Sequence, residues 1–300
     1  MESQPLNTRY GMLAALAAFI FWGFVPVFFK WLESVSAYEI IAHRILWSVA
    51  LLFLFLLIRD GRQVFQKMRL PPKTLALLAV SGTLVALNWL IFVWAINQDM
   101  VLSTSLGYFI TPLVNVLLGF IFLGERLTRA QTIAMSIAAA GTFYLAWFLG
   151  QPPWVSLALA FSFGLYGLMR KAIQAGPMTG LLWETLILSL PAVIFLFWLG
   201  GGQGNQFINS GLQTSLLLVA AGLVTVVPLI WYTTAARQLK LSTIGFFQYL
   251  APMISFFLAV FLFNEIFSFG HQVAFVCIWI ALVIISMEPL FRARRYRLPH

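Results

Sequence analysis

The chain has 300 residues, of which 61% are hydrophobic and only 9% charged, and 18 Lys and Arg against 9 Asp and Glu give a net charge of +9. This composition leaves no room for a separate soluble domain. Because the cations are divided among short loops and the two ends, it also argues against a nucleic-acid partner. The single Cys277 excludes a disulfide within the chain. The three histidines, His43, His271 and His300, lack the spacing of metal ligands, so neither a metal nor another cofactor is expected.

Ten continuously apolar stretches follow one another along the chain, and most are long enough to cross a hydrocarbon core, which takes about 20 helical residues. They cover residues 10–32, 37–58, 74–96, 101–123, 130–149, 154–169, 179–199, 212–236, 241–263 and 267–289. Unbroken apolar runs indicate helices rather than barrel strands. The first exceeds the apolar region of a cleaved signal peptide, about 7–15 residues, and should remain as a helix. We predict an all-α integral membrane protein with ten transmembrane helices.

The gaps between these stretches alternate in charge. One set of gaps, with the two ends, holds 16 of the 18 Lys and Arg residues, namely Arg9, Arg59, Arg62, Lys67, Arg69, Lys73, Arg126, Arg129, Arg170, Lys171, Arg237, Lys240, Arg292, Arg294, Arg295 and Arg297. The other gaps hold Glu33, Asp99 and Glu265. Since cationic loops stay in the cytoplasm, the pattern predicts a multi-pass protein of the bacterial inner membrane with both termini cytoplasmic. Its basic tail would lie against the lipid of that leaflet.

Two halves of the chain, 1–150 and 151–300, resemble each other. Gly-Tyr-Phe-Ile-Thr-Pro at 107–112 precedes Glu125, and Gly-Phe-Phe-Gln-Tyr-Leu-Ala-Pro at 245–252 precedes Glu265, in each case thirteen residues after the proline. Trp22-Gly23 similarly matches Tyr166-Gly167, and Glu39 matches Glu184. Five helices are an odd number, so the second repeat would enter the membrane from the opposite side. Inverted repeats are typical of secondary transporters that work by alternating access.

These residues resemble the EamA type of the drug/metabolite transporter superfamily. Its repeat carries Trp-Gly and a final basic residue in the first helix, an Arg in the second, a Pro in the fourth and Gly-Glu before the fifth. The matching positions here are Trp22-Gly23, Lys30, Arg44, Pro112 and Gly124-Glu125. The second half departs from the pattern, with Asn264-Glu265 and nothing that matches Arg44.

Within that type, segments 88–95, 107–115 and 241–249 look like the RarD group, and the likeness covers essentially the whole chain. The resemblance implies an inner-membrane permease and leaves the substrate open. We expect a small-molecule substrate, and a homo-oligomer stays possible.

Four ionisable residues in apolar helices are candidates for the substrate or proton pathway: Glu39, His43, Arg44 and Glu184. A charge near the bilayer centre costs about 2.5–3.5 kcal/mol, so each needs a partner or a wet cavity. Glu39 and His43 are one turn apart and could hydrogen-bond. Arg44 could order an anionic group. The alternative is a structural salt bridge of Arg44 or Lys30 with Glu39. Glu184 has no obvious cationic partner.

Uncharged groups complete the predicted pathway. The amides are Asn88, Asn115 and Gln248, which either line the path or join helices. The aromatic rings are Trp22, Trp89, Tyr108, Tyr166 and Tyr249, which could face a flat or cationic solute. Pro112 and Pro252 would kink their helices, Gly164 and Gly167 would allow close helix contact, and Glu125 and Glu265 are expected to be structural turn residues.

Among function classes, an ATP-driven pump is disfavoured because no lysine follows a glycine, so the phosphate-binding loop is missing. No catalytic serine or aspartate constellation is recognisable. We therefore expect a carrier, not an enzyme, which exports a small organic metabolite or drug and is coupled to protons through Glu184 or Glu39. The alternative is a polytopic membrane enzyme that acts on a lipid or lipid-linked substrate, and a passive channel is a third option.

Overall fold

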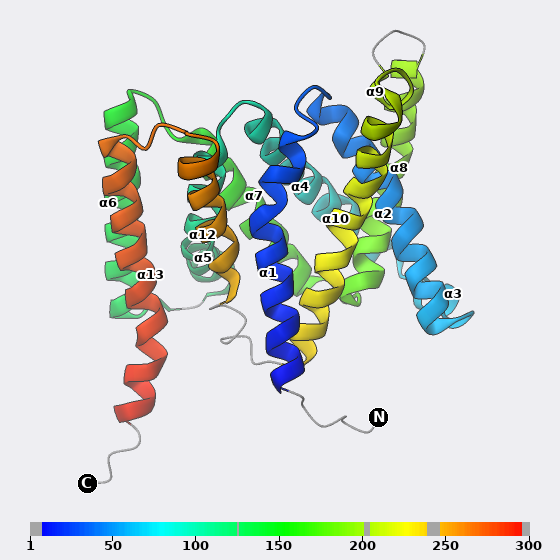
Figure 1. The fold of residues 1–300 in the computed structure, drawn as a ribbon. Helices are drawn as coiled ribbons and strands as arrows, with labels where there is room; N and C mark the ends of the chain where they lie inside the picture. The colour runs from blue at the N-terminus through cyan, green and yellow to red at the C-terminus, as the bar shows by residue number, and fades with distance from the viewer. Residues whose placement is uncertain (1–7, 125, 201–204, 239–246, 296–300) are drawn as a thin grey trace.

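The computed structural model describes residues 8–124, 126–200, 205–238 and 247–295, and every regular element in these ranges is a helix (Figure 1). The elements are α1 (Thr8–Lys30), α2 (Ala37–Asp60), α3 (Gln63–Lys67), α4 (Pro72–Asn97), α5 (Val101–Leu123), α6 (Arg129–Leu149), α7 (Trp154–Ala172), α8 (Pro177–Gly200), α9 (Gln206–Asn209), α10 (Gly211–Gln238), α12 (Leu250–Phe257), the π-helical turn η1 (Leu258–Leu262) and α13 (Phe269–Arg295).

Apolar helices dominate this architecture. Within the described residues, seven helices are long and apolar enough to cross a membrane, and three shorter apolar segments are Trp154–Arg170, Leu250–Leu262 and Phe269–Ile284. These ten segments lie on the ten predicted stretches, although 241–246 lies outside the described residues. The prediction of an all-α membrane protein is therefore confirmed. The short helices α3 and α9 lie in gaps that hydropathy left unassigned.

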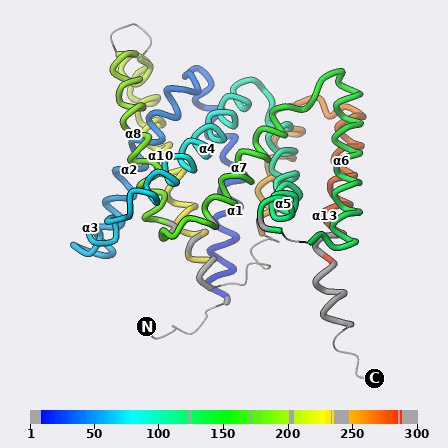
Figure 2. The backbone as a smooth tube through the Cα atoms, turned by 180° about the vertical axis from the view of Figure 1, so that it is seen from behind, coloured from blue at the N-terminus to red at the C-terminus, as the bar shows by residue number. Residues whose placement is uncertain are grey.

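The helix packing pairs elements of the first half with elements of the second. Taken in chain order, the long helices α1, α2, α4, α5 and α6 of the first half correspond to α7, α8, α10, α12 and α13 of the second. The contact of α5 with α7 then has its counterpart in that of α12 with α1, and the contact of α4 with α7 in that of α10 with α1. Likewise, the contact of α2 with α10 has its counterpart in that of α8 with α4. The remaining extensive contacts join α2 to α8, α5 to α12 and α6 to α13. The α6–α13 pair lies at one side of the bundle in both backbone views (Figures 1 and 2). Each extensive contact between halves thus has a counterpart with the halves exchanged, or joins two equivalent helices.

Local sequence explains where several of these helices begin and end. The Ser36 side chain accepts a hydrogen bond from the Glu39 N–H at the start of α2, and Thr128 and Gln131 cap α6 reciprocally. Before Glu265, Asn264 has a φ of 53°, close to the 64° of Gly124 at the end of α5. Asparagine tolerates this left-handed conformation better than most residues. The replacement of Gly by Asn in the second half therefore preserves the backbone turn.

Small residues allow the halves to approach closely at some positions but not at others. A Cβ on Gly82 would lie 3.2 Å from the Glu184 Cβ, and one on Gly222 would lie 2.5 Å from the Trp47 Cβ. In α7, a Cβ on Gly164 would lie 2.9 Å from a Val114 methyl, whereas a Cβ on Gly167 would have no described atom of another element within 4 Å. The predicted close contact therefore holds for Gly164 and is wrong for Gly167.

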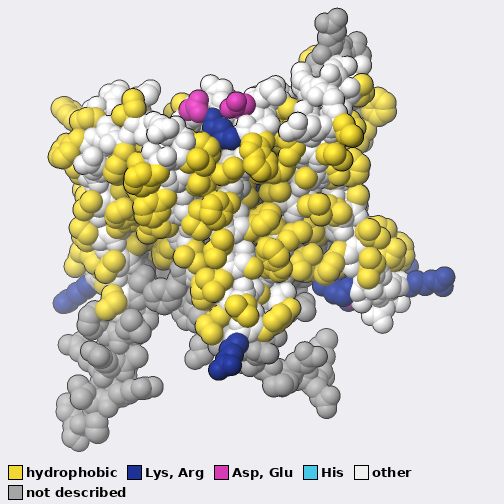
Figure 3. Space-filling view, viewed as in Figure 1, with side chains coloured by type: hydrophobic (Ala, Val, Ile, Leu, Met, Phe, Trp, Pro, Cys, Tyr) yellow, Lys and Arg dark blue, Asp and Glu magenta, His cyan; other side chains and the backbone are white. Residues whose placement is uncertain are grey.

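Most exposed charged side chains lie at the two ends of the bundle, and Asp60 is an acidic residue that lies with the cations Arg59 and Lys67. In the space-filling view, most visible Lys and Arg lie at the lower edge, whereas the visible Asp and Glu lie at the upper edge beside one cation (Figure 3). α1 begins and α13 ends toward the lower edge (Figure 1). The arrangement in space thus follows the alternation of charge read from the sequence.

Candidate functional site

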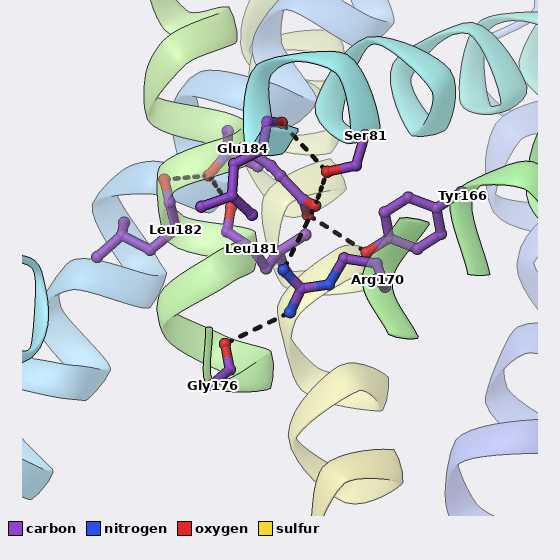
Figure 4. Close-up of polar contacts among 9 residues, drawn as sticks. Ser81, Tyr166, Arg170, Gly176, Leu181, Leu182 and Glu184 are labelled. Atoms are coloured by element: carbon purple, nitrogen blue, oxygen red, sulfur yellow. Dashed lines mark hydrogen bonds and ion pairs between the residues drawn. The ribbon is translucent and has the colours of Figure 1, made fainter. Parts of the chain in front are cut away.

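A buried polar cluster surrounds Glu184 in α8 (Figure 4). Its carboxylate accepts hydrogen bonds from Ser81 of α4 at 2.6 Å and from the Tyr166 hydroxyl of α7 at 3.3 Å. The Glu184 side chain is 0% exposed. Two of the predicted pathway residues, Glu184 and Tyr166, are therefore in direct contact, and Ser81 joins them from the other half of the chain.

Glu184 also has a cationic partner, which corrects the expectation that it has none. Arg170 Nη1 lies 3.6 Å from Glu184 Oε1, and Arg170 Nη2 donates to the Gly176 carbonyl oxygen at 3.4 Å. The sequence suggested that Arg170 lies in a loop, but α7 continues through it to Ala172. A Cβ on Gly180 would lie 2.1 Å from Arg170 Nη1, so the missing side chain makes room for the guanidinium.

Arg44 in α2 occupies a second buried position, which is 7% exposed. Its Nε donates to the Thr225 hydroxyl of α10 at 2.7 Å. Its guanidinium carbon lies 4.3 Å from the Trp89 ring centroid and 5.6 Å from that of Phe29. These are cation–π distances. The suggested salt bridge with Glu39 does not form among the described residues, because Arg44 bonds to a hydroxyl and to rings instead.

Asn88 and Tyr108 lie next to this arginine site. The Asn88 amide donates to the Leu159 carbonyl at 3.0 Å and to Ser162 Oγ at 2.9 Å, which ties α4 to α7. The Tyr108 hydroxyl lies 3.5 Å from Asn88 Oδ1. The predicted residues Arg44, Asn88, Trp89 and Tyr108 are thus brought together, and Asn88 serves as a helix–helix link.

Glu39 and His43 lie nearer the N-terminal end of α2 and make separate contacts. Glu39 Oε1 accepts from the Phe207 N–H of α9 at 3.0 Å, and the His43 ring stacks on Phe207 with centroids 4.6 Å apart. No hydrogen bond joins the two side chains within the described chain, contrary to expectation. Glu39 Oε2 and His43 Nε2 are buried and have no protein partner there.

The remaining predicted pathway residues are dispersed. Trp22 packs on Phe19 and Tyr232, at centroid distances of 5.4 and 5.8 Å. Asn115 is exposed, next to Gly164, and does not join either cluster. Gln248 is half-buried, and Tyr249 packs against the main hydrophobic core.

The predicted structural residues connect the two halves at one end of the bundle. Glu265 accepts from the Val101 and Leu102 N–H groups at 2.6 and 2.9 Å, which caps α5 from the loop before α13. Burial raises the pKa of the Glu265 carboxyl, and these two amide hydrogen bonds act against that rise. Lys30 bonds to Asp99 and lies 3.7 Å from Glu33, not near Glu39 as one alternative required.

Pro112 lies inside α5, whereas Pro252 is the third residue of α12, and the Pro252 carbonyl accepts a hydrogen bond from the Ser105 hydroxyl at 2.8 Å. Glu125 lies outside the described residues. Four residues of the two clusters were not predicted: Ser81, Arg170, Thr225 and Ser162. Ser81, Thr225 and Ser162 carry a signal, as small hydroxyl residues within apolar helices, whereas hydropathy placed Arg170 in a loop.

Comparison with known proteins agrees with this architecture. The EamA-like transporter family matches the chain twice, over residues 9–147 and 153–287. The chain is 46% identical to "Protein RarD" of Salmonella typhimurium over 291 residues, covering 96% of this chain and 98% of that one. It is equally identical to an "Uncharacterized transporter" of Vibrio cholerae over 301 residues, covering 99% of each.

A "Chloramphenicol-sensitive protein RarD" of Pseudomonas aeruginosa is 30% identical over 282 residues, covering 93% of this chain and 94% of that one. One solved crystal structure shares the fold, with a TM-score of 0.61 at 18% identity over 94% of this chain and 98% of the other. The chain is thus a multi-pass membrane protein of a transporter class. It belongs to the EamA-like transporter family and, within it, is a permease of the RarD type.

Proposed function

We propose that the chain is a secondary transporter that exports a small organic metabolite or drug across the bacterial inner membrane by alternating access. Ten transmembrane helices form two inverted five-helix halves, 1–150 and 151–300, and both termini are cytoplasmic. A proton is coupled to transport through Glu184.

Three observations support the inverted arrangement. The family matches each half separately. The extensive contacts between the halves are either exchanged pairs, such as α4–α7 and α1–α10, or pairs of equivalent helices such as α2–α8. The cationic loops alternate with acidic ones along the chain, as expected when every second loop is cytoplasmic. Substrate sites in such folds lie where the repeats meet.

The main observation in favour of proton-coupled transport is the cluster around Glu184. Its residues come from both halves, Ser81 from α4 and Tyr166, Arg170 and Glu184 from α7 and α8. Protonation of Glu184 would remove the negative charge that Arg170 faces at 3.6 Å and weaken this attraction. The same contacts join α4 to α8, so a proton at this carboxyl would change the affinity between the halves.

The test uses the purified chain in proteoliposomes with an imposed proton gradient. Glu184→Gln keeps the shape of the side chain and one of its two acceptor oxygens but cannot ionise. We expect transport to lose its dependence on pH and on the gradient. The matched control is Glu33→Gln, because the Glu33 side chain is 63% exposed and lies outside the cluster. An unchanged rate and an unchanged pH dependence would remove Glu184 from the mechanism.

A further inference from the structure

The guanidinium of Arg44 carries a charge that no described carboxylate balances. None of the ion pairs among the described residues includes Arg44. Glu39, in the preceding turn of α2, bonds to the Phe207 N–H, and Glu184 faces Arg170. An arginine stays protonated in proteins, so this buried side chain remains a cation.

Among the described residues, most hydrogen-bond donors of Arg44 also have no partner. A guanidinium has five N–H donors. In the described chain only Nε of Arg44 makes a hydrogen bond, to Thr225. Neither Nη atom is among the fully enclosed polar atoms that lack a partner, so these nitrogens keep some accessible surface. The free edge of the guanidinium is therefore available to a ligand.

Aromatic rings surround this cation. Trp89 and Phe29 lie against the guanidinium, Phe92 is 6.2 Å from Phe29, and Tyr108 is 5.7 Å from Phe92, between ring centroids. The rings come from α1, α4 and α5, whereas Thr225 belongs to α10 in the other half. The site therefore lies where the halves meet, and it offers apolar ring surface next to a positive charge.

We propose that Arg44 binds an anionic oxygen group, a carboxylate or a phosphate ester, of the transported organic solute. The inference rests on the proposed transport function and specifies its substrate class. The planar fork of Nη donors fits two oxygens of such a group, and charge-assisted bidentate pairs are strong and geometrically specific. Trp89 and Phe29 hold the plane of the guanidinium, and Thr225 fixes its Nε edge, so the solute meets an oriented cation.

The experiment measures thermal stabilisation of the purified full-length chain by four probes that share a phenyl ring: benzoate, phenyl phosphate, benzamide and benzylamine. We expect an anion to stabilise the chain, and the uncharged amide and the cationic amine to have little effect. A larger stabilisation by benzoate than by phenyl phosphate would indicate that the solute carries a carboxylate. A larger stabilisation by phenyl phosphate would indicate a phosphate ester. Equal stabilisation by benzamide and the anions, or none by either anion, would overturn the proposal.

Variants assign the effect to Arg44. In Arg44→Gln the anion should bind at least about tenfold more weakly, because a hydrogen-bonded charge is lost, and Arg44→Lys should retain part of the binding. The control is Lys67→Gln, which removes a half-exposed cation paired with Asp60. If Arg44→Gln does not fold, Thr225→Val tests the orientation of the cation instead. Anion binding that survives these changes at Arg44 and Thr225 would contradict the assignment.

A transport assay separates this inference from the function on which it rests. Anion-selective binding without movement of any solute across proteoliposome membranes would contradict the transport proposal but still support the anion site at Arg44. Transport restricted to uncharged or cationic solutes would support the transport function and contradict the anion site at Arg44.

Discussion

Arg44 and Glu184 occupy the same position in two helices that pack against each other: each lies seven residues after the first residue of its helix, α2 and α8, both of 24 residues. Each bonds to a hydroxyl on the third long helix of the other half, Arg44 to Thr225 of α10 and Glu184 to Ser81 of α4. One half thus places a buried cation where the other places a buried anion. This relationship replaces the predicted match of Glu184 with Glu39, which lies only two residues into α2.

Removing the Ser81 hydroxyl should destabilise the Glu184 cluster. Ser81→Ala takes away a 2.6 Å hydrogen bond to a buried carboxylate, a loss of about 1.5–3 kcal/mol. We expect a lower unfolding temperature and altered pH dependence of transport. Ser189→Ala is the control, because within the described part of the chain the Ser189 hydroxyl bonds only to the Leu186 carbonyl of its own helix. Equal stability losses in both variants would argue against a special role for Ser81.

The Thr225 hydroxyl should matter for substrate affinity more than for folding. Thr225→Val keeps the shape of the side chain but removes the acceptor of the Arg44 Nε–H. We expect KM for transport to rise about two- to tenfold, as for one hydrogen bond. The control is Thr234→Val, also in α10, since the only bond of the Thr234 hydroxyl to a described residue goes to the Ile230 carbonyl. KM should stay unchanged in this variant. A KM unaffected in Thr225→Val would show that this contact does not orient Arg44 for binding.

The close approach of α10 to α2 depends on Gly222. A methyl group in Gly222→Ala would lie 2.5 Å from the Trp47 Cβ and 2.8 Å from its backbone carbon, so the helices must separate. Overpacking of this kind costs about 1–3 kcal/mol, visible as a lower unfolding temperature in detergent. In Gly167→Ala the added carbon meets no described atom of another element within 4 Å and the helix gains propensity, so the variant should be neutral or slightly stabilising. Wild-type stability in Gly222→Ala would contradict the packing described for α2 and α10.

Glu265 should stabilise the contact between the two halves at one end of the bundle. Glu265→Ala leaves the Val101 and Leu102 N–H groups without their acceptor and should cost about 0.5–2 kcal/mol, as for other N-caps. Glu265→Gln retains one acceptor oxygen and should recover part of the loss. The unfolding temperatures of the two variants, compared with that of the control Glu33→Gln, measure the stability that the Glu265 cap contributes. If Glu265→Ala unfolded at the wild-type temperature, the cap would be energetically unimportant.

Hydropathy and charge predict most of the fold for two reasons. Lipid requires long apolar helices, and Lys and Arg concentrate in every second loop. The helix α7 is longer than predicted, since its last turn carries Arg170, a charge that hydropathy reads as a loop. That misreading also hid the ion pair with Glu184, which depends on Gly180 for space. Arg44, Trp89 and Tyr108 were each predicted because polar or aromatic groups in apolar helices are informative. Their common location, and the role of Thr225, depend on packing between halves, which one sequence does not reveal.

The most direct measurement compares metabolites inside and outside cells that overproduce the wild-type chain, Arg44→Gln or Glu184→Gln. We expect a set of chemically unchanged organic anions to move across the membrane only with the wild-type chain. Chemical conversion without redistribution, or the same redistribution with both variants, would contradict it.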